Sequence, residues 1–190
     1  NMIESFLSGI NCMIDNKIIK SAPVSPYITF VDPIVKQICV ENWGSDGEIT
    51  YEQAAAVTDL NGAFDYWSNN PPTEQITSFD ELRYFTGLTI LGESPDGDGQ
   101  FSGAEQLVSI ILPPNLITLG YGTFDNCTSL TSIDIPNSVT LIGNSAFYGC
   151  TGLTSITIPN SVISIGNYAF KDCSGLTSIT IGNSVTSIGD

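Results

Sequence analysis

From Leu107 onward, the apolar positions of the chain recur with a period of 23 residues. Units begin at Leu107, Leu130 and Leu153, and a partial unit runs from Leu176 to Asp190. Each unit reads Leu-x-Ser-Ile-x-(Ile/Leu)-Pro-x-x-(Val/Leu)-x-x-(Ile/Leu)-Gly-x-x-(Ala/Thr)-Phe-x-x-Cys-x-x. One unit buries little apolar surface alone, so a fixed period of this length predicts a solenoid whose turns pack on their neighbours.

Within one unit, polar and apolar side chains alternate as in a strand. In the segment 130–135, Leu130, Ile133 and Ile135 are predicted to point inward, and Ser132 and Asp134 to point outward. The pattern favours a strand that forms one side of each turn.

The rest of the unit predicts two further sides. Pro136 ends the strand, and Gly143 is expected to permit a sharp corner. Ala146, Phe147 and Cys150 close the third side. The predicted fold is therefore α+β: a small helical N-terminal domain followed by a right-handed β-solenoid of 23-residue units.

The front segment has helix-start signals instead of a period. Asp32-Pro33 combines an N-cap residue with proline at the first helical position. Thr50 with Gln53 forms a capping box for a second helix. These signals predict two helices joined by a short connection.

The front segment has further local signals, and the repeat begins gradually after them. The segment 27–31 is strand-like, and Ser78 with Glu81 resembles another capping box that opens a short helix through Phe85. Beyond it, apolar positions match the repeat only in part. The predicted division is an N-terminal domain at 1–80 and a solenoid at 81–190, with an irregular first unit at 81–106, regular units at 107–129, 130–152 and 153–175, and a partial unit at 176–190.

The framework of the repeat carries a family resemblance. The string Leu-Thr-Ser-Ile-Thr-Ile-Pro-Asn-Ser-Val at 153–162, followed by Ile165-Gly166, Ala169-Phe170 and Cys173, resembles the BspA-type leucine-rich repeat. The lead-in before the repeats, from Val40 to Leu88, is also similar to one seen in that family. The resemblance implies an exported protein of a bacterial cell surface. Some relatives are described as adhesins for host matrix proteins or other cells, and the resemblance implies no reaction.

Charge is distributed unevenly along the chain. The net charge is −15 with only five basic residues, and the segment 41–105 holds 13 acidic residues and one basic residue, Arg83. From Leu107 onward only five residues are charged. Nucleic acid is an improbable partner, because phosphate binding needs clustered lysine and arginine. No apolar run approaches the length of a membrane helix, so membrane insertion is not expected for this chain.

Catalytic patterns are absent from the sequence. The chain has no histidine, which removes the commonest general base and zinc ligand. Its serines therefore lack the usual activating partner, and paired carboxylates in the acidic half are expected by chance. We expect no enzymatic activity.

Two loops are candidate cation sites, and the first of them resembles a calcium loop. The segment 42–53 resembles an EF-hand loop, with Gly47 and Ile49 in place, but several ligand positions lack carboxylates. A structural helix connection is the favoured interpretation, and no cofactor is expected. Asp96 and Asp98, on a glycine-rich loop, are interpreted as a solvated turn. The weak metal candidates of the first loop are Asn42, Asp46, Glu48 and Glu52.

The outward strand positions are the candidate ligand-binding face. Leucine-rich repeats often bind ligands through rows of short side chains on a rigid scaffold. The alternative is that serine and threonine merely suit solvent-facing strands. Ile111 is the odd member, an apolar residue in a polar row, and coverage by the front domain is the alternative to exposure. The predicted row is Ser109, Ile111, Ser132, Asp134, Ser155, Thr157, Ser178 and Thr180.

The five cysteines fall into two groups. Cys127, Cys150 and Cys173 share one repeat position and are predicted to form a buried column of free thiols. Free thiols in an exported protein suit a reducing habitat. Cys12 and Cys39 are able to pair, but nothing in the sequence selects a disulfide between them.

Together these features favour an extracellular or cell-surface recognition or adhesion protein that binds a protein or glycan, such as a host matrix protein. The alternative is a structural spacer or display stalk with no ligand in this segment. The last repeat is uncapped, so we expect the native chain to continue or another chain to cover it, including self-association through that repeat. The first residues do not form a signal peptide, which fits a mature form, a shortened chain or a cytosolic protein.

Overall fold

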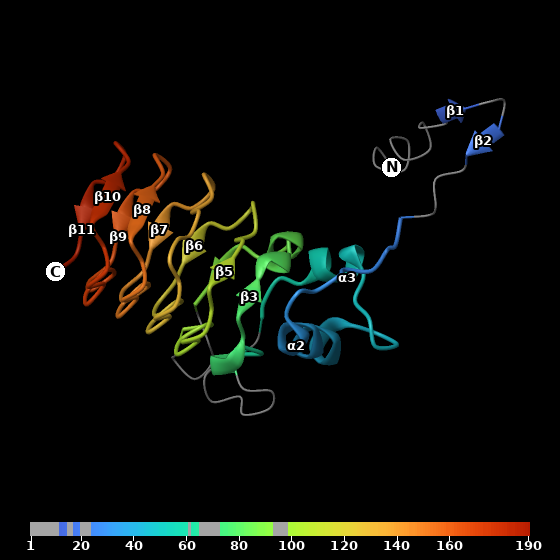
Figure 1. Ribbon diagram of the computed structural model, residues 1–190. Coiled ribbons are helices and arrows are strands. Elements are labelled where there is room, and N and C mark those ends of the chain that lie inside the picture. The colour runs from blue at the N-terminus through green and yellow to red at the C-terminus, as the bar shows by residue number, and fades with distance from the viewer. Residues whose placement is uncertain (1–11, 15–16, 20–23, 61, 65–72, 93–98) are drawn as a thin grey trace.

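The computed structural model describes residues 12–14, 17–19, 24–60, 62–64, 73–92 and 99–190. Short helices lie at one end, and the repeats stack as successive turns toward the C-terminus (Figure 1). The fold is a β-solenoid with a 23-residue spacing, as the repeat predicts. A single cluster of buried apolar residues runs from Ile28 to Cys173 and so includes both the helical segment and the repeats.

The two helix-start signals are confirmed. Helix α2 spans Pro33–Trp43, with Asp32 as its N-cap. Helix α3 spans Tyr51–Ala56, and its capping box is complete, because Thr50 and Gln53 bond each other's backbone N–H groups. Two 3-10 helices follow, at Thr73–Gln75 and Asp80–Tyr84.

Two expectations for the front segment are wrong. The segment 27–31 forms an isolated bridge between Tyr27 and Thr50 and is not a strand. The capping box at Ser78 is absent: Ser78–Phe79 is strand β3, and the following 3-10 helix has no side-chain cap. The reason lies in Glu81, whose carboxylate accepts the N–H of Val31 at 3.1 Å instead of returning to Ser78.

Asp32 joins the helical segment to the solenoid. One carboxylate oxygen accepts the N–H groups of Ile34 and Val35, at 2.8 and 3.2 Å, and so caps α2. The other accepts the N–H and the hydroxyl of Thr77, at 2.6 and 2.9 Å. Burial raises the pKa of Asp32, but these four hydrogen bonds lower it more, and the net pKa lies below its usual value.

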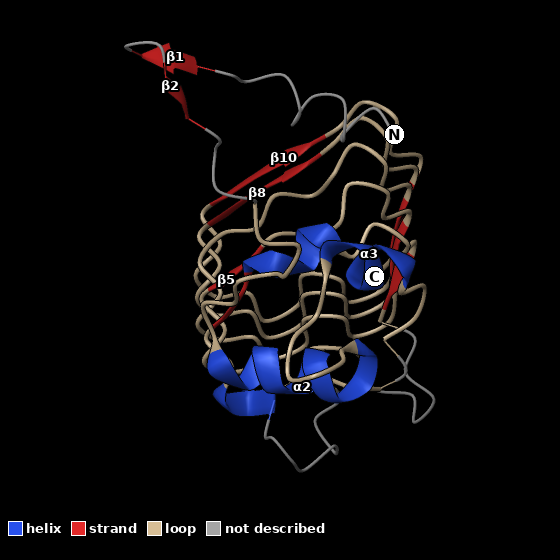
Figure 2. Ribbon diagram, turned by 90° about the vertical axis from the view of Figure 1, so that its right-hand side faces the viewer, coloured by secondary structure: helices blue, strands red, loops and turns tan. Residues whose placement is uncertain are grey.

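The strands of the solenoid lie on two sides of the coil (Figure 2). On one side, β3 pairs with β5 and β8 pairs with β10; on the other side β4, β6, β7, β9 and β11 form one parallel sheet. An antiparallel pair, β1 with β2, precedes α2 in sequence. The bounds not yet given are Cys12–Ile14 (β1), Lys17–Ile19 (β2), Ile90–Leu91 (β4), Ser109–Ile110 (β5), Thr118–Leu119 (β6), Leu141–Ile142 (β7), Ser155–Ile158 (β8), Ser164–Ile165 (β9), Ser178–Ile181 (β10) and Ser187–Ile188 (β11).

The register advances by one repeat per turn. Ser155 pairs with Ser178, and Leu141 pairs with Ser164. The ladder extends back to β3, where Phe79 pairs with Ile110. It therefore begins slightly ahead of residue 81, where the irregular first unit was predicted to start, and the division into two domains stays a prediction.

Two local expectations for the repeat need correction. The segment 130–135 buries Leu130, Ile133 and Ile135 as predicted, but its backbone is not a regular strand. Alternation of side chains is thus retained without a full hydrogen-bonded ladder. Gly143 does not serve a left-handed corner; a Cβ there would lie 2.7 Å from the carbonyl carbon of Gly120, so the glycine permits close contact between turns.

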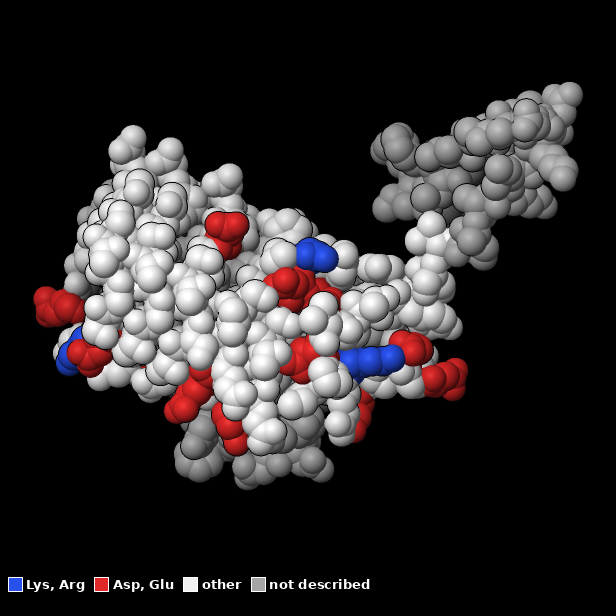
Figure 3. Space-filling view, in the orientation of Figure 1, with Lys and Arg blue, Asp and Glu red and all other residues white. Residues whose placement is uncertain are grey.

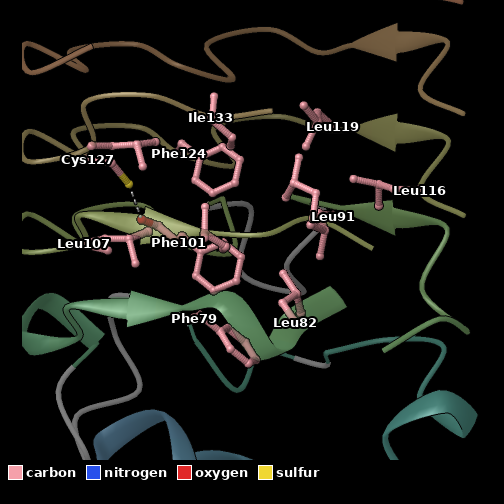
Figure 4. Packing of buried hydrophobic residues seen from close by; sticks show 14 of the residues in the cluster. Phe79, Leu82, Leu91, Phe101, Leu107, Leu116, Leu119, Phe124, Cys127 and Ile133 are labelled. Carbon is pink, nitrogen blue, oxygen red and sulfur yellow. Dashed lines mark hydrogen bonds between the residues drawn. The ribbon is translucent and has the colours of Figure 1, made fainter. Parts of the chain in front are cut away.

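The core of the repeats is a column of stacked side chains. Phe101, Phe124, Phe147 and Phe170 follow one another with ring centroids 5.4–5.6 Å apart and nearly parallel planes. Figure 4 shows Phe79, Phe101 and Phe124 in successive layers, flanked by buried leucines. Each turn therefore packs the same side chain on its copy in the next turn.

The predicted thiol column is confirmed. Cys127, Cys150 and Cys173 are free and buried, and each thiol donates to a phenylalanine carbonyl of the preceding turn at 3.0–3.2 Å. Burial raises the pKa of all three thiols, that of Cys150 to about 12. Cys39 is also free and buried, so the disulfide with Cys12 is not formed; the side chain of Cys12 lies outside the described residues.

Candidate ligand-binding face

The outward strand positions lie on the side of the coil formed by β3, β5, β8 and β10. In β8, Ser155 and Thr157 are exposed, whereas Ile156 and Ile158 are buried. Parallel pairing places Thr157 directly beside Thr180 of β10. In β8 the predicted row is therefore a surface feature, fixed by a strand whose other face is held in the core.

A groove of about 590 Å³ crosses three turns along one edge of this row. Its polar lining comes from two columns, one of Asp134, Thr157 and Thr180, and one of Asn137, Asn160 and Asn183. Ile135, Ile158, Ile181, Pro159 and Gly182 complete the lining. We name this feature the strand-face groove. It combines three of the eight predicted row residues with three asparagines.

The asparagine column was missed by sequence reasoning. Asn137 follows Pro136, where the strand was expected to end, and its recurrence at Asn160 and Asn183 was a usable signal. The side-chain carbonyl of Asn160 accepts the backbone N–H of Asn183 at 2.9 Å. The Asn160 side chain is thus held across the turns, and its NH2 group supplies donors beside the hydroxyls of the threonine column.

The groove does not include the whole predicted row. Ser109, Ser132, Ser155 and Ser178 lie outside its lining. Ile111 is 41% exposed, so the alternative that the front domain covers it is wrong. In that first regular turn, Ile111 and Pro114 occupy the positions that Asp134 and Asn137 take one turn later. The face therefore changes from apolar to polar along the solenoid axis.

A second cavity, of about 370 Å³, lies at the last turn. It is lined by core-column residues such as Phe170, by the backbone of Gly166 and Gly189, and by Tyr168 and Lys171. Most of its lining side chains occupy repeat positions that, in the preceding turns, pack against the next turn of the solenoid. The strand-face groove is the better candidate, because six of its eleven lining residues are polar and lie on the outside of the coil.

The candidate calcium loop is folded as a tight helix connection. Ser45 and Glu48 form an antiparallel bridge around Asp46 and Gly47, which both have positive φ. The side-chain amide of Asn42 donates to its own helix, at the carbonyl of Ile38, 2.9 Å away. These contacts favour the structural helix connection, and calcium binding, the less favoured alternative, stays untested.

Two side chains of the same loop have protein partners. The carboxylate of Glu48 forms a salt bridge with the ammonium group of Lys36, with 2.8 Å between nitrogen and oxygen. Gln53, at the last ligand position of the loop, belongs to the capping box of α3. Among the described residues, no cluster of three or more histidine, cysteine or acidic side chains is positioned to hold a metal ion. Asp96 and Asp98 lie outside the described residues.

The charge of the surface follows the division seen in the sequence. In the view of Figure 3, acidic side chains are concentrated over the front half and at the far end of the repeats, and the middle of the repeats is nearly uncharged. Asp134 is the one acidic residue in the lining of the strand-face groove, which holds no basic residue. This groove is suited to neutral or cationic groups rather than to phosphates.

The fold and its exposed rows define a leucine-rich repeat solenoid. Residues 96–190 match the family described as the BspA type leucine rich repeat region, in six copies, and the chain belongs to this family. No curated protein matches the chain significantly. Among the described residues, no helix is both long and apolar enough to cross a membrane.

Solved structures with some similarity are also leucine-rich repeat proteins. A leucine rich repeat protein of T. pallidum is 25% identical with a TM-score of 0.43, over 60% of this chain and 65% of that one. A leucine rich cell surface protein of Faecalibacterium prausnitzii is 32% identical with a TM-score of 0.43, over 55% of this chain and 28% of that one. The chain thus spans less than two thirds of either protein.

Proposed function

We propose that this chain is the recognition module of a cell-surface or secreted protein, and that a protein or glycan ligand binds in the strand-face groove. The observation that carries the proposal is the groove itself, which three consecutive turns line with the same two polar columns. The cell-surface location is supported by the family and by the name of the Faecalibacterium prausnitzii protein. We propose no reaction for the chain.

The binding mechanism is rigid display. Buried Ile135 and Ile158 lie beneath the groove and hold the backbone that carries Asp134, Thr157 and Asn160. Because the scaffold is preformed, little conformational entropy is lost when a ligand binds. Carboxylate, hydroxyl and amide groups offer acceptors and donors side by side, which suits peptide groups and sugar hydroxyls alike.

The test is solid-phase binding of the purified chain to a panel of matrix proteins and neutral glycans. The double variant Asp134→Arg, Thr157→Arg fills the groove with two long cations. Both residues are exposed, so the variant is expected to keep the stability of the parent chain. Saturable binding that the variant loses supports the proposal, whereas equal binding by both chains refutes the groove as the site.

The alternative function is a structural spacer. The observation that favours it is the uniform stack of Phe101, Phe124, Phe147 and Phe170, which gives a stiff rod whether or not a ligand binds. A spacer predicts no binding anywhere on the panel. It also predicts that changes in the groove alter neither stability nor any interaction of the chain.

A further inference from the structure

The outer face of the five-stranded sheet carries a regular pattern of aliphatic and hydroxyl side chains. Two neighbouring columns of exposed or half-buried residues cross β4, β6, β7, β9 and β11. One lies within the strands and is set by their register, and the other is formed by the residue before each strand. The first column is Thr89, Ile117, Thr140, Ile163 and Thr186, and the second is Ile90, Thr118, Leu141, Ser164 and Ser187. In each of the first four turns, one column holds a branched aliphatic residue and the other a hydroxyl. We name this surface the checkerboard face.

The aliphatic residues of this face are well exposed. Ile90, Ile117, Leu141 and Ile163 expose 45%, 46%, 38% and 52% of their surface. Single exposed aliphatic residues are ordinary, but four in successive turns form a contiguous patch. The checkerboard face lies on the opposite side of the coil from the strand-face groove, so the two surfaces are separate (Figure 2).

The hydroxyls on the checkerboard face are partly used within the fold. Thr186 donates to the carbonyl of Ile163 at 3.2 Å, and Thr140 approaches that of Ile117 at 3.5 Å. Their methyl groups are then the parts that remain for contact. Neither column contains a charged residue. A partner that packs on this face therefore gains apolar contacts and removes few polar groups from water.

We propose that the checkerboard face pairs with the same face of a second copy of this chain. A two-fold axis along the strand direction, passing through Leu141, reverses the order of turns but keeps each column opposite itself. Ile117 then faces Ile163 of the second copy, Leu141 faces its own copy, and Thr140 faces its own copy. Aliphatic residues meet aliphatic residues in the three middle turns, and hydroxyls meet hydroxyls everywhere except at the outer pair, where Ile90 faces Ser187.

A second possible two-fold axis in the plane of the sheet does not match aliphatic residues with aliphatic residues. A two-fold axis along the solenoid places the first column opposite the second within the same turn. Ile117 would then face Thr118, and Leu141 would face Thr140, so each aliphatic residue would meet a hydroxyl. The pairing of side chains therefore favours the first axis.

Charge supports the same arrangement. The chain has a net charge of −15, and 13 of its acidic residues lie between Glu41 and Glu105. An axis that reverses the order of turns places the acidic front halves of the two copies at opposite ends of the pair. A side-by-side arrangement with the turns in the same order would bring the two acidic halves together, which electrostatic repulsion opposes.

The size of the checkerboard face makes the predicted dimer weak. Five strands at about 4.8 Å spacing extend over about 19 Å. The strands are two residues wide, so the contact is smaller than the roughly 800 Å² per partner of a stable complex. We therefore expect a monomer–dimer equilibrium that responds to concentration.

The first test is site-specific cross-linking in the full chain. In a Cys12→Ser background, Leu141→Cys places a thiol on the proposed axis, while Cys39, Cys127, Cys150 and Cys173 are buried. Mild oxidation is expected to give disulfide-linked dimers of this variant. Ser187→Cys faces Ile90 of the second copy in the proposed register, and Thr157→Cys lies in the strand-face groove, so both controls should stay monomeric. Equal cross-linking of all three variants, or none of Leu141→Cys, overturns the proposal.

Sedimentation equilibrium over a range of concentrations gives an independent test. Leu141→Lys should lower the association constant about tenfold, because two cations would meet at the axis. Thr157→Lys on the other side of the coil is the matched control and should associate as the parent chain does. A parent chain that stays monomeric at every concentration refutes the dimer, and so does a Leu141→Lys variant that associates as strongly as the parent chain.

Discussion

Aromatic side chains pack differently in the helical segment and in the repeats. In the helical segment, Trp43 meets Phe85 at 75° between ring planes, and Tyr51 meets Tyr84 at 87°. In the repeats, Phe101, Phe124 and Phe147 are nearly parallel, with angles of 8° and 18°. Edge-to-face contact is a preferred geometry for an isolated aromatic pair.

The difference shows what repetition imposes on a fold. Each turn of the solenoid is translated onto the next, so equivalent rings keep one rotamer and must stack in parallel. The helical segment has no repeated unit, so each aromatic ring there adopts the angle that suits its own neighbours. Stability in the repeats should therefore depend on a shared column, whereas in the helical segment it should depend on single contacts.

The largest expected effect comes from interrupting the column. Phe124 is fully buried between Phe101 and Phe147, so Phe124→Ala should lower the free energy of unfolding by about 3–5 kcal/mol. Tyr51 is 40% exposed and pairs with Tyr84 at the surface, so Tyr51→Ala should cost about 1 kcal/mol. Urea denaturation followed by circular dichroism measures both, and equal losses would contradict the distinction.

The next effect concerns the single residue that joins the two regions. Asp32→Ala removes the α2 cap and the acceptor for both donors of Thr77, and should cost about 2–3 kcal/mol. Asp32→Asn keeps one acceptor oxygen and should cost less. Urea denaturation at neutral pH compares the three chains, and a loss below about 0.5 kcal/mol for Asp32→Ala would show that Asp32 does not hold the regions together.

Asp32 also predicts the acid response of the fold. Its pKa is lower in the folded chain than in the unfolded one, so its stabilising contribution is present above the unfolded pKa of about 3.9. That contribution should be lost as the pH falls through the folded pKa. The parent chain should lose more stability than Asp32→Asn below about pH 4. Parallel acid curves for the two chains would contradict this role.

The thiol column predicts an alkaline response of the repeats. The pKa of Cys150 is raised from 9.0 to about 12 in the folded chain, so unfolded thiols ionise first as the pH rises. Its stabilising contribution is therefore present below about pH 9 and is lost between about pH 9 and 12, by about 1.4 kcal/mol per pH unit. Unfolding at pH 8 and 10 should show a smaller loss in Cys150→Ala than in the parent chain. The same loss in both would argue against a protonated buried thiol.

The smallest expected effect lies in the turn between α2 and α3. Gly47 has φ of +79° with open space around its Cα, so Gly47→Ala should cost only the backbone strain of about 1 kcal/mol. Gly47→Asn should cost less, because asparagine tolerates this conformation. Thermal unfolding measures both variants. A loss well above about 2 kcal/mol for Gly47→Ala would mean that the turn has a role beyond its backbone geometry.

The sequence predicted most where a pattern repeats or a local rule acts alone. The burial of Ile133, the thiol column and the cap at Asp32 follow from periodicity or from local hydrogen bonding. The predicted capping box at Ser78 is wrong because the carboxylate of Glu81 accepts a hydrogen bond from a distant donor, the N–H of Val31. Contacts between residues far apart in the chain leave no local signal.

The candidate site was predicted only in part for a related reason. Strand alternation placed Thr157 and Thr180 on the outer face, but it gave no information on where a groove would form. That location depends on how Asn137, Asn160 and Asn183 project beyond the strand ends, which is set by packing between turns. The exposure of Ile111 likewise depends on where the front helices end relative to the first regular turn.

The most direct test of the central claim compares the two faces in one binding assay. The parent chain, the groove variant Asp134→Arg, Thr157→Arg and the checkerboard variant Leu141→Arg are titrated against an immobilised ligand from the panel. We expect that binding to the ligand is lost in the groove variant and kept in the checkerboard variant. Binding that survives in the groove variant and is lost in the checkerboard variant would contradict it.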